Sequence, residues 1–296
     1  MTQHPYLESD SLISLKRDLH KETDLKIPRE QDFDLDSIIF TETTSYPISW
    51  WITALDDAIW WQPKWKYTMM YWWPSTGKTT LTLQVAEKNI ALWNKVCYLS
   101  LEMTKESFVL QNMRTRAGLK PKWVWNSLIP STKQVEIMRN FVEKLKKLEI
   151  KSYAEAPSYE SFTEIMNSLI VEWYDMIIVD NLWMIWRQDN LDEMVLYWKI
   201  SAFIKNYVDR SNISVMLIHH TKKWNEASAG VRWYSAYRWN WKIADDCDYV
   251  IQLERQYLDS WTTSSRIKVE KDRVWWNNWY ILNLEFNNWE FVWWLF

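Results

Sequence analysis

The sequence predicts an α/β domain in which a largely parallel β-sheet is flanked by helices. Apolar strand-like runs alternate with helical stretches between positions 66 and 219, and this alternation is typical of βαβ units with right-handed crossovers. One junction between a strand and a helix has the spacing of a phosphate-binding loop. Three later strand-like runs follow one another without a helix, so we expect a mixed sheet with an antiparallel edge.

The expected elements divide the chain into an N-terminal arm, residues 1–40, and a compact domain, residues 41–296. The arm carries one short amphipathic stretch, Leu12–Leu19. The predicted strands are apolar runs, namely Lys66–Tyr71, Lys95–Leu101, Asp175–Asp180, Ile213–His219, Tyr249–Leu253, Ser265–Glu270 and Tyr280–Phe286. The predicted helices lie between them, namely Thr79–Leu92, Lys105–Ala117, Thr132–Lys147, Ser161–Glu172 and Asp192–Arg210.

Composition excludes several classes of protein. The 296 residues carry a net charge of −3 and are 48% hydrophobic, which suits one large globular domain rather than a disordered tail or a disulfide scaffold. The sequence has no apolar run long enough to cross a membrane, and its polar N-terminus predicts no signal peptide. Cys97 and Cys247 lie far apart in apolar runs, so we expect buried thiols in a reducing, cytoplasmic setting. Weak acidity leaves only local basic patches for nucleic acid.

Tryptophan and glycine occur in unusual numbers, with 25 Trp against 3 Gly. A domain of this length would carry about 21 Gly at a usage of roughly 7%. Many Trp stand in pairs or between turn-forming residues, as at Trp50-Trp51 and Trp93-Asn94, where glycine is normal because it adopts positive φ at no steric cost. Some bacterial lineages read UGA as glycine. Our hypothesis is that most of these positions are glycine in the organism; the alternative is a truly Trp-rich surface.

The phosphate-binding loop follows the first predicted strand and opens the first predicted helix. Its spacing matches, apart from Trp where the first Gly belongs. Backbone N–H groups at a helix start bind phosphate oxygens, Lys78 supplies positive charge, and the Thr79 hydroxyl binds Mg²⁺. The residues expected to hold ATP are Trp72, Trp73, Pro74, Ser75, Thr76, Gly77, Lys78, Thr79 and Thr80.

Two carboxylates end neighbouring predicted strands. Asp180 closes the apolar run Asp175–Asp180, a Walker B pattern in which a carboxylate beside the phosphate loop holds the Mg²⁺ shell. Glu102 follows the run Lys95–Leu101, where it can orient the water that attacks the γ-phosphate. The alternative for Asp180 is an ordinary strand-ending residue.

The string Tyr98–Met103 (YLSLEM) resembles the SLEM segment of DnaB-type replicative helicases, within the RecA-like ATPase superfamily. With Trp read as Gly, Ile48–Gln84 is similar to the entrance of that core, and the likeness runs on through Asp180 to the end of the chain. The motors of Twinkle and of phage primase–helicases are similar too. The resemblance implies a RecA-like P-loop NTPase fold, ATP and Mg²⁺ as cofactors, a ring (a hexamer) that moves on single-stranded DNA, and a primase or loader as a further partner.

Three later segments carry the same comparison. Within Val215–Lys223 (VMLIHHTKK), His220 matches the family's γ-phosphate sensor better than His219, although a strand-end histidine explains it as well. Lys271 and Arg273 match a Lys-x-Arg pair that reaches the ATP of the adjacent subunit; the alternative is a strand-end ion pair. Tyr237–Lys242 resembles the family's Arg-Gly-x-Gly loop, which contacts single-stranded DNA. The alternative is a basic loop that is simply exposed to solvent. The DNA-binding candidates are Lys222, Lys223, Arg238, Asn240 and Lys242.

Two other functions stay open. A KaiC-like or recombinase-related (RadA-like) ATPase would bind nucleotide and DNA or a protein without unwinding, and Ile48–Thr80 suits that group nearly as well. An ATPase-dead scaffold follows if Trp72 and Trp73 are indoles. DnaB-type helicases carry a helical domain before the motor, whereas about 40 residues precede it here.

Overall fold

The computed structural model describes residues 48–50, 55–56, 64–72, 77–118, 131–153, 155–185, 193–220, 241–257, 263–273, 280–287 and 290–292. The predicted arm and its short helix lie outside these residues. Residues Tyr46–Phe296 group into one unit by their contacts, while the predicted boundary between residues 40 and 41 stays a prediction.

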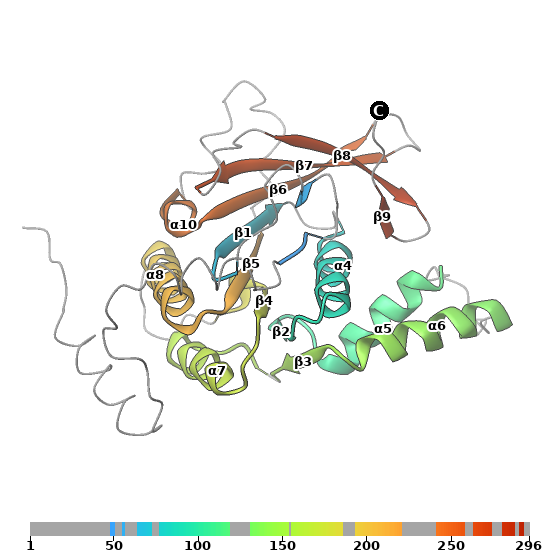
Figure 1. Cartoon of the computed structure of the whole chain (residues 1–296), viewed down its shortest axis with the longest axis horizontal. Helices are drawn as coiled ribbons and strands as arrows, with labels where there is room; N and C mark the ends of the chain where they lie inside the picture. The colour runs from blue at the N-terminus through green and yellow to red at the C-terminus, as the bar shows by residue number, and fades with distance from the viewer. Residues whose placement is uncertain are drawn as a thin grey trace, which may run out of the picture. The chain divides into compact units, whose positions relative to one another are not determined.

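The described residues form a nine-stranded sheet with helices, and most elements coincide with the predicted runs (Figure 1). The strands are β1 (Tyr67–Trp72), β2 (Val96–Ser100), β3 (Glu149–Ser152), β4 (Met176–Asp180), β5 (Ser214–His220), β6 (Tyr249–Tyr257), β7 (Thr263–Asp272), β8 (Ile281–Asn287) and β9 (Glu290–Val292). The helices are α4 (Lys78–Ala91), α5 (Lys105–Arg116), α6 (Thr132–Leu145), α7 (Tyr159–Val171), the 3₁₀ turn η1 (Leu182–Met184), α8 (Glu193–Ser211) and α10 (Trp241–Asp246).

The sheet order is β3-β2-β4-β5-β1-β6-β7-β8-β9. Neighbouring strands from β3 to β6 pair in parallel, and β6 to β9 pair antiparallel. The predicted parallel sheet with an antiparallel edge is therefore confirmed. The sequence analysis missed β3, β9 and α10, which are short; β3 is also a half-exposed edge strand with the charged residues Glu149 and Lys151.

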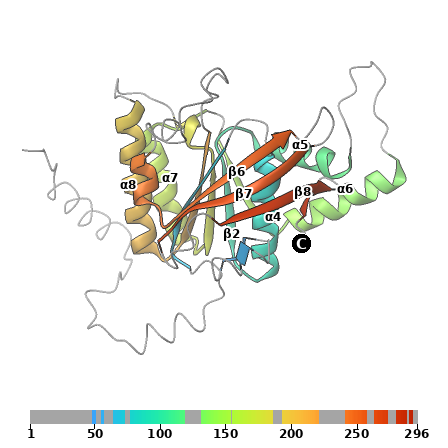
Figure 2. The same cartoon turned by 90° about the horizontal axis from the view of Figure 1, so that it is seen from above.

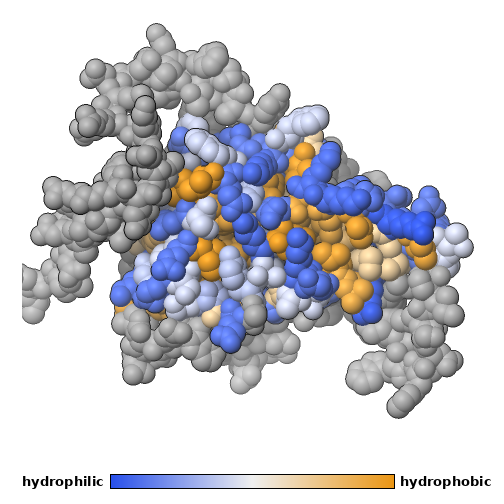
Figure 3. Space-filling view, turned by 90° about the horizontal axis from the view of Figure 1, so that it is seen from below, coloured by the Kyte–Doolittle hydropathy of each residue, from blue (hydrophilic) through white to orange (hydrophobic). Residues whose placement is uncertain are grey.

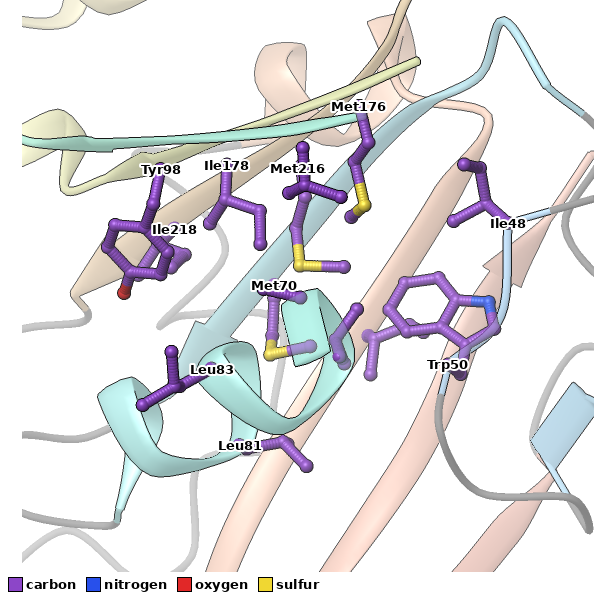
Figure 4. Packing of buried hydrophobic residues seen from close by; sticks show 14 of the residues in the cluster. Ile48, Trp50, Met70, Leu81, Leu83, Tyr98, Met176, Ile178, Met216 and Ile218 are labelled. Carbon is purple, nitrogen blue, oxygen red and sulfur yellow. The ribbon is translucent and has the colours of Figure 1, made fainter. Parts of the chain in front are cut away.

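Helices cover both faces of the sheet, with α7 and α8 on one side and α4 on the other (Figure 2). Successive strand residues point to opposite faces, so Met70 joins the core under α4 and α5 whereas Met69 and Tyr71 join the core under α7 and α8. Figure 4 shows Met70 between Met216 on one side and Leu81 and Leu83 of α4 on the other, and all four residues belong to one core cluster. Strands β2 and β4 are mostly apolar because every residue in them is buried.

Among the described residues, no helix combines the length and the hydrophobicity that a membrane crossing requires. Figure 3 shows hydrophilic side chains interspersed with hydrophobic ones on the face seen from below.

Cys97 and Cys247 are free thiols and both are buried, as predicted. Burial raises the pKa of Cys97 to about 12.

The backbone turns left-handed soon after four of the described helices. The angle φ is 68° at Trp93 after α4, 67° at Gly118 after α5, 56° at Trp173 after α7 and 58° at Asn212 after α8. Glycine, and less often asparagine, normally occupy such positions because a bulky side chain strains left-handed backbone. Two of these helices therefore end on the expected residue types and two end on tryptophan.

The helix end at Trp93 has the hydrogen bonds of a Schellman motif. The Trp93 N–H donates to the Ile90 carbonyl at 3.1 Å, and the Asn94 N–H donates to the Asn89 carbonyl at 3.0 Å. The side chains of Trp93 and Trp173 are exposed, at 84% and 80%, so neither indole gains packing that would offset the strain. This geometry supports the glycine hypothesis at both positions, and at Trp65, where φ is also 68°.

Trp50 differs from these exposed positions. It is 1% exposed and lies within the core (Figure 4), and its Nε1 has no hydrogen-bond partner among the described residues. Trp50 is not among the residues with positive φ, so backbone conformation gives no support for glycine at this position.

Replacing Trp93 by glycine should stabilise the chain. We expect Trp93→Gly to raise the free energy of unfolding by about 1 kcal/mol, because glycine removes the cost of left-handed backbone. Urea denaturation of both proteins measures the difference.

Trp198→Gly is the matched control, because Trp198 lies inside α8, where glycine costs about 1 kcal/mol and the free energy of unfolding should fall. A loss of stability in Trp93→Gly would contradict the hypothesis. So would tryptophan in the tryptic peptide Asn89–Lys95 of the natural protein, whose mass distinguishes the two residues.

Candidate functional site

The carboxyl ends of four parallel strands gather the predicted site residues. In the sheet, β2, β4, β5 and β1 are successive neighbours, and in parallel sheets ligands bind beyond the carboxyl ends of the strands. Glu102 follows β2, Asp180 ends β4, His220 ends β5 and Trp72 ends β1. The apolar strands thus deliver polar residues from distant parts of the sequence to one edge.

Helix α4 begins directly after the predicted phosphate loop. Gly77 is its N-cap with φ 93°, a conformation that favours glycine. Lys78 and Thr79 form the first turn, with Thr80 after them, and Lys78 is only 8% exposed. Burial lowers the pKa of Lys78, while the charges of Asp180 and Glu102 raise it. Positions 73–76 of the predicted loop lie outside the described residues.

Asp180 is a buried carboxylate at the head of α4. It is 4% exposed, and its Oδ2 accepts a hydrogen bond from the Tyr98 hydroxyl at 2.7 Å. Burial raises the pKa of Asp180 from 3.8 to about 6, against the opposing effects of Tyr98, Lys78 and the Thr79 hydroxyl. The structure therefore brings Lys78, Thr79 and Asp180 together.

Glu102 lies beside this group and is exposed. Its Oε2 accepts a hydrogen bond from the Asn181 side-chain amide at 2.6 Å. The charge of Glu102 raises the pKa of both Lys78 and Asp180, so the carboxylate lies in the neighbourhood of both.

The cluster suits a magnesium nucleotide. A buried ammonium with a lowered pKa is stabilised by an added anion, and a buried carboxylate with a raised pKa by an added cation. The described residues contain no group of three or more His, Cys, Asp and Glu side chains that could hold a metal. Mg²⁺ commonly needs no such group, since it binds one or two protein ligands together with phosphate oxygens and water.

Sequence reasoning missed three residues of the site. Tyr98 contacts Asp180, the Thr82 side-chain oxygen lies 3.0 Å from the Tyr98 hydroxyl, and Asn181 holds Glu102. Strand alternation could have pointed to Tyr98. Tyr98 and Ser100 face the same side of β2, and Ser100 lies opposite Asp180 in the neighbouring strand. The position of Asn181 directly after Asp180 was the other available signal.

The two histidines of β5 are the last two residues of the strand. His219 is 2% exposed and its ring meets that of Tyr197 edge to face, with centroids 5.6 Å apart. His220 pairs in register with Trp72 at the end of β1, which is where the sequence analysis expected a phosphate sensor.

The predicted DNA-binding residues fall largely outside the described part of the chain. This holds for Lys222, Lys223, Arg238 and Asn240. Lys242 differs from its prediction as a loop residue, because α10 begins at Trp241. The helix forms where Ile243 is buried with the core under α8.

Lys271 and Arg273 lie near the amino end of strand β1, whereas Lys78 follows its carboxyl end. Asp272 pairs with Tyr249 of β6, which pairs with Thr68 at the start of β1. The six residues of β1 span about 20 Å at roughly 3.3 Å each. Lys271 donates to the carbonyls of Ala244 at 2.6 Å and Asp245 at 2.8 Å, and Arg273 donates to the Asp245 carbonyl. The pair therefore does not join the Lys78 cluster of its own chain.

A family model, the DnaB-like helicase C-terminal domain, matches residues 52–286. Among solved structures, an ATPase domain matches with a TM-score of 0.72 and 17% identity, over 88% of this chain and 99% of that one. A DnaB-like replicative helicase, described with its interactions with primase, matches with a TM-score of 0.72 and 15% identity, over 95% of this chain and 75% of that one.

A KaiC-like protein from Pyrococcus horikoshii matches with a TM-score of 0.59 and 13% identity, over 84% of this chain and 99% of that one. No match was found among curated proteins. At these identities the likeness to solved structures shows the fold, which is the predicted RecA-like α/β fold.

The buried carboxylate predicts a pH dependence of stability. The pKa of Asp180 is higher in the folded chain, about 6, than its ordinary 3.8, so its contribution to stability is lost as pH rises between these values. Asp180→Asn should therefore raise the free energy of unfolding above pH 6 by about 1–3 kcal/mol without nucleotide, measured by urea denaturation from pH 4 to pH 8.

Asp175→Asn is the matched control on the same strand-loop unit. Asp175 is partly exposed and pairs with Lys64 at 2.7 Å, so its replacement should cost stability by up to about 1 kcal/mol. A fall in the free energy of unfolding in Asp180→Asn, like the fall expected in Asp175→Asn, would contradict the burial argument for Asp180.

Proposed function

The chain belongs to the DnaB-like helicase C-terminal domain family, and on this premise we propose that it is an ATP-dependent, ring-forming DNA helicase. In this proposal a hexamer moves along single-stranded DNA and unwinds duplex, and ATP is hydrolysed at the subunit interfaces. The observation that carries it is the cluster of Lys78, Thr79 and Asp180 at the head of α4, with Glu102 beside it.

Each residue of the cluster has a role that its position supports. Lys78 places its ammonium against phosphate oxygens, where the first turn of α4 also presents backbone N–H groups. Thr79 and Asp180 hold the metal shell, and Glu102 orients the attacking water. Bound ATP would supply the phosphoryl bond that is cleaved, and bound Mg²⁺ would neutralise charge on its phosphates. His220, at the end of β5, would sense the γ-phosphate.

The proposed site is completed by a neighbouring subunit. Lys271 and Arg273 lie at the far edge of the sheet from Lys78 of the same chain, and Arg273 keeps 47% of its side chain exposed. An exposed arginine that cannot reach its own nucleotide can stabilise phosphoryl charge in an adjacent subunit. This arrangement supports an oligomer as the active form.

DNA and protein partners form the rest of the proposal. Segment 221–240 directly follows β5 in the sequence, and its residues Lys222, Lys223, Arg238 and Asn240 would contact DNA. Lys242 would add a contact from α10. A primase or a loader would be a further partner, and the two buried free thiols suit a reducing cytoplasm.

A second candidate is a KaiC-like ATPase that binds nucleotide and a partner without unwinding, favoured by the shared fold. Phosphate release with and without single-stranded DNA, combined with unwinding of a forked duplex, separates the two. Stimulation with unwinding supports the helicase, and stimulation without unwinding supports the second candidate. No turnover in either the Trp or the Gly form would indicate a scaffold.

Removing the phosphate-binding lysine should abolish turnover. In protein made with glycine at the recoded positions, we expect Lys78→Ala to lower phosphate release by about 10²–10³-fold, because an electrostatic contact to the transition state is lost. Lys88→Ala, in the last turn of the same helix, is the control that should leave turnover unchanged. Normal turnover in Lys78→Ala would remove the phosphate-loop assignment.

Mixing two inactive variants tests the shared site. Arg273→Ala should assemble and bind ATP yet hydrolyse it slowly, and mixing it with Lys78→Ala should restore turnover, because some interfaces then combine an intact Lys78 with an intact Arg273. Arg266→Ala is the control. Arg266 pairs with Glu254 in its own chain, so this variant should hydrolyse ATP at the parent rate without any mixing. If no mixing ratio restores phosphate release, the finger does not act between subunits.

A further inference from the structure

We propose that Asn181 is a positioning residue for Glu102, and this rests on the proposed ATPase function. Asn181 directly follows Asp180 at the end of β4, and Glu102 follows the end of the neighbouring strand β2. The two strands pair in parallel with Ser100 opposite Asp180, so the residues beyond their ends come side by side.

The backbone holds these two strand ends together. The Leu101 N–H donates to the Asp180 carbonyl at 2.7 Å, which extends the pairing of β2 and β4 by one step. The Asn181 Nδ2 then donates to the Glu102 Oε2 at 2.6 Å. A hydrogen bond to an ionised carboxylate is shorter and stronger than one between neutral groups, so Asn181 is a firm anchor for this side chain.

The two partners differ in their surroundings. Asn181 is 1% exposed, whereas Glu102 is exposed. An exposed glutamate samples many rotamers, and restricting them costs entropy. The buried amide fixes one oxygen of the carboxylate and thereby its direction. Orienting a catalytic group before the reaction accelerates the step that it assists.

The amide is also chemically suited to this role. It donates hydrogen bonds without carrying charge, so it holds Glu102 without adding a charge next to Lys78 or Asp180. An aspartate at position 181 would repel Glu102, and an alanine would remove this hydrogen bond. Asn181 also neighbours Asp180 in sequence, and a role through Asp180 would change the Mg²⁺ requirement, whereas a role through Glu102 would not.

The test measures steady-state ATP turnover, with saturating single-stranded DNA, in Asn181→Ala and Asn181→Asp. Loss of a hydrogen bond to a charged group corresponds to about a 10–100-fold fall in kcat. We expect this fall with KM for ATP and the Mg²⁺ requirement unchanged. Asn112→Ala is the matched control, because Asn112 is also buried and donates to the Phe108 carbonyl at 2.8 Å; it should lower stability without changing kcat.

A double-mutant cycle shows whether Asn181 acts through Glu102. In a Glu102→Ala background, Asn181→Ala should have no further effect on the residual single-turnover rate. A further fall in that background, a raised Mg²⁺ requirement, or unchanged or faster turnover in folded Asn181→Ala each overturns the proposal. Failure of the proposed ATPase function looks different, because the parent protein would then hydrolyse no ATP.

Discussion

The burial of the Asp180 carboxylate beside Lys78 is the constraint on which the site depends. Strands β4 and β2 are fully buried, so the carboxylate at the end of β4 is withdrawn from water and its pKa rises. Tyr98, Thr79 and Lys78 offset part of that cost. A cation near Asp180 and an anion near Lys78 would relieve the remaining cost of burying these two charges.

The left-handed helix ends bear on the identity of the residues themselves. Gly118 and Asn212 show that this fold places ordinary left-handed residue types after α5 and α8, and Trp93 and Trp173 occupy the same conformation after α4 and α7. Because their indoles are exposed, no packing explains them. A code in which these codons specify glycine explains the turns and the shortage of glycine together.

The sequence predicted the parallel core and its antiparallel edge because continuous apolar runs and intervening helices are strong signals. It also placed Lys78 and Thr79 at the start of a helix and Asp180 at the end of a buried strand, because each of these assignments rests on a local pattern. It did not predict β3 or α10, whose formation depends on tertiary contacts, nor the bonds from Tyr98 to Asp180 and from Asn181 to Glu102. Those bonds join residues that are distant in sequence, and only the strand register brings them together.

The same sheet explains why Lys271 and Arg273 lie apart from the Lys78 cluster within one chain. Glu102, Asp180 and the start of α4 lie at the carboxyl ends of the parallel strands. Strand β7 runs antiparallel to them, so its own carboxyl end, with Lys271 and Arg273, lies beside their amino ends. No rearrangement of side chains spans a six-residue strand. If Arg273 acts on a nucleotide at all, it must act on one that another subunit binds, so hydrolysis would depend on how two subunits sit against each other.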